Sequence, residues 1–124
     1  AEAHLRAGDP AKALAITETA LGLQERIFRS EVWRIRGMAF AQQGAMSDAE
    51  RCLRAGLELA REQDAQIFAL RSAAAVGETL RRLGRASEAR VLLSQVCDEA
   101  IVARGSVDFE AAERELRLCG AAAP

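Results

Sequence analysis

The chain contains few of the residues that interrupt helices or build catalytic sites. Its 124 residues include two prolines, one histidine and no tyrosine. The longest stretch without a charged residue is 37–47, whereas a helix that spans a membrane needs about 18 or more apolar residues. The first residues also lack the apolar core of a secretory signal. We therefore expect a cytoplasmic protein that makes no contact with a membrane.

Cysteine is scarce and widely spaced. The three cysteines are Cys52, Cys97 and Cys119, an odd number with no CxxC pair. This spacing excludes a disulfide framework and a zinc knuckle and is typical of a reducing compartment. Cys97 follows Val96 on an apolar helix face, which predicts packing rather than nucleophilic chemistry.

Motifs of catalysis and of nucleic-acid binding are also missing. The 17 basic and 18 acidic residues nearly cancel to a net charge of −1, so nothing favours nucleic acid as a partner. The chain has no GxxxxGK[ST] phosphate loop and no GxSxG nucleophile elbow. His4, the single histidine, has no cysteine or paired carboxylate at ligand spacing. We expect a protein that is not an enzyme and holds no cofactor or metal.

Helix-forming residues fill the chain instead. Alanine alone occupies 27 positions, and alanine, leucine, arginine and glutamate all favour helices. Apolar residues recur at the i, i+3, i+4, i+7 spacing of amphipathic helices. The fold class is therefore predicted to be all-α. The predicted helices span residues 10–23, 31–43, 47–62, 66–83, 87–103 and about 108–119.

Glycine marks the predicted helix ends. Gly8, Gly44 and Gly84 each follow an apolar helical pattern, and glycine adopts the left-handed conformation of a helix C-terminus without steric cost. Gly105 is predicted to end the fifth helix in the same way. Because each of the first three turns is only about four residues long, the helices it joins must be antiparallel neighbours.

Polar residues mark the predicted helix starts. Asp9 precedes Pro10, which is the order of an N-cap and the first helical residue. Ser47 lies three residues before Glu50, the spacing of a capping box. Asp108 is the predicted N-cap of the last helix.

The chain repeats itself at a fixed spacing. A shift of about 40 positions superimposes glycines on glycines and leucine on leucine, and a shift of about 36 aligns the first unit. The matched pairs include Gly37 and Gly77, Gly44 and Gly84, Ala49 and Ala89, and Leu53 and Leu93. A period of this length built from two helices predicts a solenoid. We divide the single domain 1–124 into units of about 1–29, 30–65 and 66–105, followed by a capping helix at 106–120.

The pattern resembles the tetratricopeptide repeat (TPR) family. The residues of the second unit that match the family in order are Trp33, Gly37, Phe40, Gly44, Ala49 and Leu53. The third unit matches at Gly77, Leu80, Gly84, Ala89 and Leu93, with Ala73 in place of the tryptophan. Gly56 stands where the family usually has alanine. The resemblance implies about two and a half stacked helix pairs that act as a protein-binding scaffold.

A narrower resemblance concerns the parent protein. The segments that carry it are residues 34–37, 43–44, 49–50 and 52–53. They look like the long-period repeats at the C-terminus of bacterial class III adenylate cyclases and related ATPase-type regulators. Residues 107–112 resemble the capping helix of that group. The resemblance implies a fragment of a larger signalling or transcription-regulatory protein whose catalytic domains lie upstream.

The candidate binding residues lie on the first helix of each pair. In TPR proteins this helix lines the concave groove. The residues predicted to face the groove are Glu31, Arg34, Met38, Gln42, Arg71, Glu78, Arg81 and Arg82, with Ala74 between them. Arginine there could bind partner carboxylates in bidentate fashion. The alternative is an ordinary solvated face whose arginines reflect genomic base composition.

Three functions follow as hypotheses. The first is an interaction module for a protein or peptide segment, which could belong to another domain of the same chain. The second is a ligand-sensing or self-associating domain, with a homodimer formed through an uncovered apolar flank of helix 10–23. The third is an enzyme or a DNA-binding helical domain. It has less support because no catalytic motif is present, the helices are too long for a helix-turn-helix and the turns recur.

Overall fold

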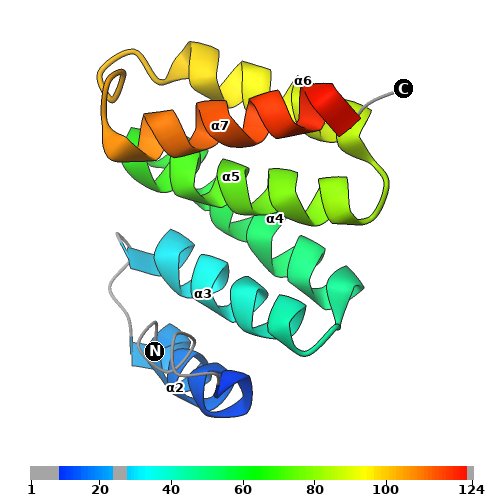
Figure 1. The fold of residues 1–124 in the computed structure, drawn as a ribbon. Helices are drawn as coiled ribbons and strands as arrows, with labels where there is room; N and C mark the ends of the chain where they lie inside the picture. Colours follow the sequence, from blue (N-terminus) through cyan, green and yellow to red (C-terminus); the bar gives the residue numbers. More distant parts are fainter. Residues whose placement is uncertain (1–8, 24–27, 123–124) are drawn as a thin grey trace.

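The computed structural model describes residues 9–23 and 28–122 of the chain (Figure 1). This described part is all-helical and contains no strand, which confirms the predicted all-α fold. The helices are α2 (Pro10–Leu23), α3 (Arg29–Gln42), α4 (Met46–Glu62), α5 (Gln66–Arg82), α6 (Ala86–Glu99) and α7 (Val107–Ala122). None of these helices is both long and apolar enough to cross a membrane. His4 and Gly8 lie outside the described residues.

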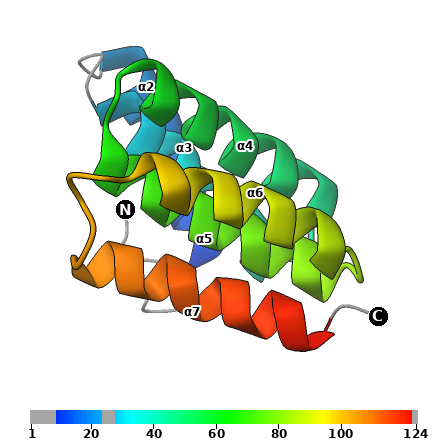
Figure 2. The same ribbon diagram turned by 90° about the horizontal axis from the view of Figure 1, so that it is seen from above.

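The helices form a stack of antiparallel neighbours. Helices α3, α5 and α7 run in one direction, and α4 and α6 run in the other (Figure 1). Helix α5 packs against α3, α4, α6 and α7, whereas α2 packs against α3 alone among the described helices. Figure 2 shows α4 and α6 on one side of the stack and α7 on the other. One face is therefore built from α3, α5 and α7, and the opposite face from α4 and α6.

The repeat seen in the sequence is also present in the packing. A Cβ atom added to Gly37 would lie 2.6 Å from Leu53 Cγ, and one added to Gly77 would lie 2.6 Å from Leu93 Cδ1. Both leucines are almost fully buried. The same close crossing of a glycine and a leucine thus recurs one unit later, as the sequence pattern predicts.

The predicted glycine turns are confirmed at two helix ends. Gly44 and Gly84 have φ angles of 80° and 78°. After the first of these turns, the Ala45 amide donates to the Phe40 carbonyl at 2.9 Å. After the second, the Arg85 amide donates to the Leu80 carbonyl at 2.8 Å. Both helices therefore end in a Schellman motif.

Asp64 forms a third turn of this kind without glycine. Its φ angle is 54°, and the next amide, of Ala65, donates to the Ala60 carbonyl at 2.8 Å. Aspartate tolerates the left-handed conformation better than most residues do. The turn between α4 and α5 therefore has the backbone geometry of the glycine turns, but its left-handed residue carries a carboxylate side chain.

One of the two N-cap predictions for α2 and α4 is confirmed. Asp9 Oδ1 accepts a hydrogen bond from the Lys12 amide at 3.1 Å. The Ser47 prediction is wrong, because α4 begins one residue earlier and its N-cap, Ala45, makes no side-chain cap bond. The partner carboxylate of the expected capping box, Glu50, binds Arg54 of α4 and Arg85, the residue before α6, instead.

The boundary between α6 and α7 also differs from the prediction. Helix α6 ends at Glu99 rather than at 103, so Gly105 lies in the following turn. The chain leaves the helix early because the amide of the buried Ala103 donates to Gln66 Oε1 of α5 at 2.9 Å. Asp108 does not cap α7. Ser106 does so, since its Oγ accepts the Phe109 amide at 3.1 Å.

Candidate functional site

Half of the predicted groove residues line one hollow between α3 and α5. The hollow has a volume of about 330 Å³. Met38 and Gln42 come from α3, and Glu78 and Arg82 occupy the equivalent positions of the next unit, on α5. The remaining walls are formed by Ala41, Leu53, Ala75 and Thr79. The parallel course of α3 and α5 and the register of the repeat bring these side chains together.

Three other predicted residues form an ion-pair cluster nearby. The Arg34 guanidinium donates to Glu31 at 2.9 and 3.2 Å, and Arg71 Nη1 donates to Glu31 Oε1 at 2.8 Å. Arg71 Nε also donates to Asp108 of α7 at 3.0 Å. The bond to Glu31 raises the pKa of Arg71 above its ordinary value. The cluster ties α3, α5 and α7 together.

Arg34 is buried rather than open to the groove. Only 7% of it is exposed, so its predicted place on an accessible stripe is corrected. The reason is that Glu31, one helical turn earlier, accepts its guanidinium and holds the side chain against the helix.

Arg81 faces α7 and is also paired. It binds Glu115 in bidentate fashion, at 2.6 and 3.2 Å, and Glu115 is 8% exposed. Cys119 donates to the same carboxylate at 3.4 Å, and burial raises the pKa of its thiol to about 11. Cys119 is therefore a protonated packing residue, and Arg81 is occupied within the chain.

Arg82 is the remaining arginine of the predicted set. It is exposed and makes no ion pair with any other described residue. The predicted binding of partner carboxylates can thus be carried by Arg82, whereas Arg34, Arg71 and Arg81 already bind carboxylates of this chain.

A ring of charges lies on the opposite face, and its pairs between helices were not predicted from the sequence. Arg54 of α4 donates to Glu50 at 2.9 Å and to Glu88 of α6 at 2.8 Å. Arg85 donates to Glu50 at 2.7 and 3.1 Å and to Glu88 at 2.9 Å. These bonds, chiefly the one from Arg85, lower the pKa of Glu50. The sequence contains a signal for these pairs, because arginine and glutamate recur 34 or 35 positions apart, close to the repeat period.

Two shorter-range pairs, Glu58 with Arg61 and Glu88 with Arg85, are predicted by the i, i±3 spacing of opposite charges in the sequence. The pair of Arg85 and Glu88 is confirmed. The other, between Arg61 and Glu58, is wrong, because Arg61 Nη2 donates to Glu99 of α6 at 2.7 Å. Both outcomes show that arginines of this face bind carboxylates of α6.

Within residues 9–23 and 28–122, no group of three or more histidine, cysteine, aspartate or glutamate side chains is placed to hold a metal ion. Cys52 and Cys97 are buried and reduced, and burial raises the pKa of both thiols. Comparisons of the chain with protein-family models, curated proteins and solved structures find no match. The candidate site is therefore the hollow between α3 and α5, because Glu78 and Arg82, two of the predicted residues that line it, have exposed charged side chains.

Proposed function

We propose that this chain is a non-enzymatic protein-interaction module of the TPR type. The observation that carries the proposal is the hollow between α3 and α5, where Met38, Gln42, Glu78 and Arg82 come together. The recurrence of the Gly37–Leu53 crossing in the next unit supports a repeat architecture. Stacked helix pairs of this kind offer an extended surface to a partner.

The hollow suits a peptide that carries an acidic residue beside an apolar one. The Met38 side chain and the neighbouring alanines supply apolar contact, and the flexible thioether adapts to irregular partners. Arg82 supplies an exposed guanidinium that can bind a carboxylate in bidentate fashion. Glu78 is also exposed and disfavours a second acidic residue next to the first.

The resemblance to the C-terminal repeats of bacterial class III adenylate cyclases and related ATPase-type regulators bears on the parent protein. We propose that the module is a regulatory C-terminal segment of a larger bacterial signalling or transcription-regulatory protein in the cytoplasm. Its partner would then be another protein or a domain of the same parent chain.

Cross-linking followed by affinity measurement tests this function. A photo-reactive amino acid at Glu78 would capture the bound segment, and a synthetic peptide of that segment would then be titrated. We expect Arg82→Glu to weaken binding about tenfold or more, as the loss of a charge-assisted pair predicts. The matched control is Arg90→Glu, on an exposed position of α6. Equal losses for both variants, or none for Arg82→Glu, would reject the groove.

Self-association through α2 is the second candidate function. Helix α2 contains only two charged residues, Lys12 and Glu18, and packs against α3 alone among the described helices. Ile16 on this helix is 37% exposed. A helix with so few charges is usually covered on most sides. A monomer in sedimentation over a broad concentration range would reject this candidate.

A further inference from the structure

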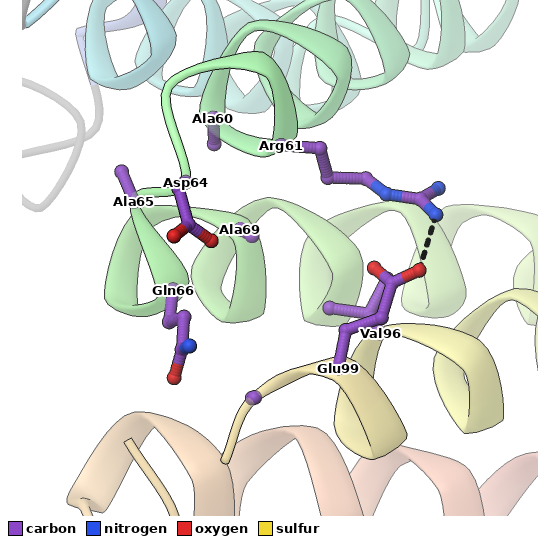
Figure 3. A pocket seen from close by; sticks show the side chains of 9 residues that line it. Ala60, Arg61, Asp64, Ala65, Gln66, Ala69, Val96 and Glu99 are labelled. Carbon is purple, nitrogen blue, oxygen red and sulfur yellow. Dashed lines mark hydrogen bonds and ion pairs between the residues drawn. The ribbon is translucent and has the colours of Figure 1, made fainter. Parts of the chain in front are cut away.

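A second hollow lies where α4 turns into α5, beside the end of α6 (Figure 3). Its volume is about 340 Å³, near the lower end of the range for small-ligand pockets. The buried residues of its wall are small and apolar, namely Ala60, Ala69, Val96 and Ala100. The small side chains leave room that larger residues would fill. This hollow is separate from the one between α3 and α5, because the two share no residue.

The charges around this hollow favour a cation. Arg61 Nη2 donates to Glu99 at 2.7 Å, so these two charges offset each other, and Figure 3 shows both side chains turned toward each other. Asp64 is exposed and makes no ion pair with any other residue of the described chain. Two helices, α4 and α6, end at this corner with their negative dipole ends, whereas only α5 begins there. Among the residues that line this hollow, the charge left over is the negative charge of Asp64.

Asp64 occupies a position where the other turns have glycine. Gly44 and Gly84 end α3 and α5 at φ angles close to 80°. A side chain in this conformation carries a conformational cost, and such positions concentrate at functional sites. The carboxylate at this turn adds nothing to the Schellman hydrogen bonds, which are made by the backbone.

An apolar ledge continues from this hollow. A neighbouring depression of about 440 Å³ shares Asp64 and Gln66 with it and is bounded by Ile67, Val102 and Arg104. The Arg104 guanidinium lies over the Phe109 ring, 5.9 Å from its centroid, and makes no ion pair with Asp64. Val102 is 88% exposed, and Ile101 beside it is 69% exposed. Exposed aliphatic side chains next to a hollow are typical of a contact surface.

We propose that this corner binds a lysine or arginine side chain of a partner protein, with an aliphatic residue next to it in the partner sequence. The aliphatic stem of the basic residue lies against the alanines of the wall. Its charged end binds the Asp64 carboxylate, and the neighbouring aliphatic residue lies in the depression beside Val102. The positive charge of the partner side chain is thus complementary to the negative charge of Asp64.

The test uses a short peptide as the probe. Acetyl-Leu-Arg-Leu-amide carries one guanidinium between two aliphatic residues, and acetyl-Leu-Gln-Leu-amide is the uncharged control. Each peptide is titrated into the full chain labelled with ¹⁵N while the amide resonances are followed. We expect saturable shifts in residues 60–69 and 96–104 with the arginine peptide alone.

Three variants make the result decisive. Asp64→Asn preserves the left-handed turn and should weaken binding about threefold to tenfold, the range for a partly exposed charged contact. Asp98→Asn removes an equal charge outside the hollow and should leave the affinity unchanged. Arg61→Gln releases Glu99 and should strengthen binding.

Equal shifts from both peptides, or an Asp64→Asn variant that binds as the parent does, would overturn the proposal. The Arg82→Glu variant should not change this affinity. Failure at this corner is therefore distinguishable from failure of the groove between α3 and α5.

Discussion

Replacement of Gly56 with alanine tests how closely α3 and α4 approach each other. A Cβ atom at this position would lie 2.8 Å from the Ser30 carbonyl oxygen, 3.3 Å from Trp33 Cβ and 3.4 Å from the Arg34 amide nitrogen. The nearest atom belongs to the backbone, so rotation of a side chain cannot relieve the contact. The two helices must therefore separate.

The expected cost follows from two opposing effects. Overpacking of a close contact costs about 1–3 kcal/mol, and a backbone contact belongs in the upper half of that range. Alanine also stabilises a helix interior by about 1 kcal/mol relative to glycine. We expect Gly56→Ala to lower the free energy of unfolding by about 1–2 kcal/mol. For a chain of this size the melting temperature should fall by about 4–8 °C.

Thermal unfolding followed by circular dichroism measures this difference. The control is Gly120→Ala in α7, because no atom lies within 4 Å of its added Cβ. That variant should retain the parent stability or gain up to about 1 kcal/mol. A Gly56→Ala variant that is as stable as the parent would refute the close approach, and it would fit the alanine that the TPR pattern usually has here.

Three further predictions concern stability and reactivity. Asp64→Gly should raise the free energy of unfolding by about 0.5–1 kcal/mol, because glycine adopts the positive φ without strain. Urea titration measures this difference, and unchanged or lower stability would contradict the prediction. Glu50→Gln should lower stability at pH 7 by at most about 1 kcal/mol. The lowered pKa of Glu50 means that its contribution is present above the ordinary value of 4.5 and is lost as pH falls through the folded value. The variant should therefore lose less stability than the parent between neutral and acid pH, and parallel pH profiles would contradict the role of Arg85. Cys119 should resist alkylation in the folded chain at pH 8, because burial holds the pKa of its thiol at about 11; mass spectrometry showing rapid modification at Cys119 would contradict its packing.

The helix pattern was readable because apolar spacing and turn residues agree over most of the chain. The start of α5 at Gln66 was predicted although no glycine precedes it, since the periodicity of Ile67 and Leu70 fixes that helix. The end of α6 was not readable. It depends on a bond between Ala103 and Gln66, which are distant in the sequence and which no local pattern connects.

The candidate groove was predictable as a helix face but not as a set of available side chains. Spacing places Arg71 and Arg81 on α5, yet it does not reveal that carboxylates of α7 bind both of them. Long arginine side chains reach across helices, so their partners depend on tertiary distances. Only the structure separates Arg82, which remains exposed, from its paired neighbours.

The ion pairs that join one helix pair to the next have a consequence for cooperativity. They connect side chains about one repeat apart in the sequence, on both faces of the stack. In a linear array, the free energy between adjacent units determines whether they unfold together or one at a time. Because these ion pairs are partly exposed, their contribution falls as ionic strength rises. Salt therefore weakens the ionic part of the boundary between units, whereas the buried apolar cluster that joins α4 to α7 remains.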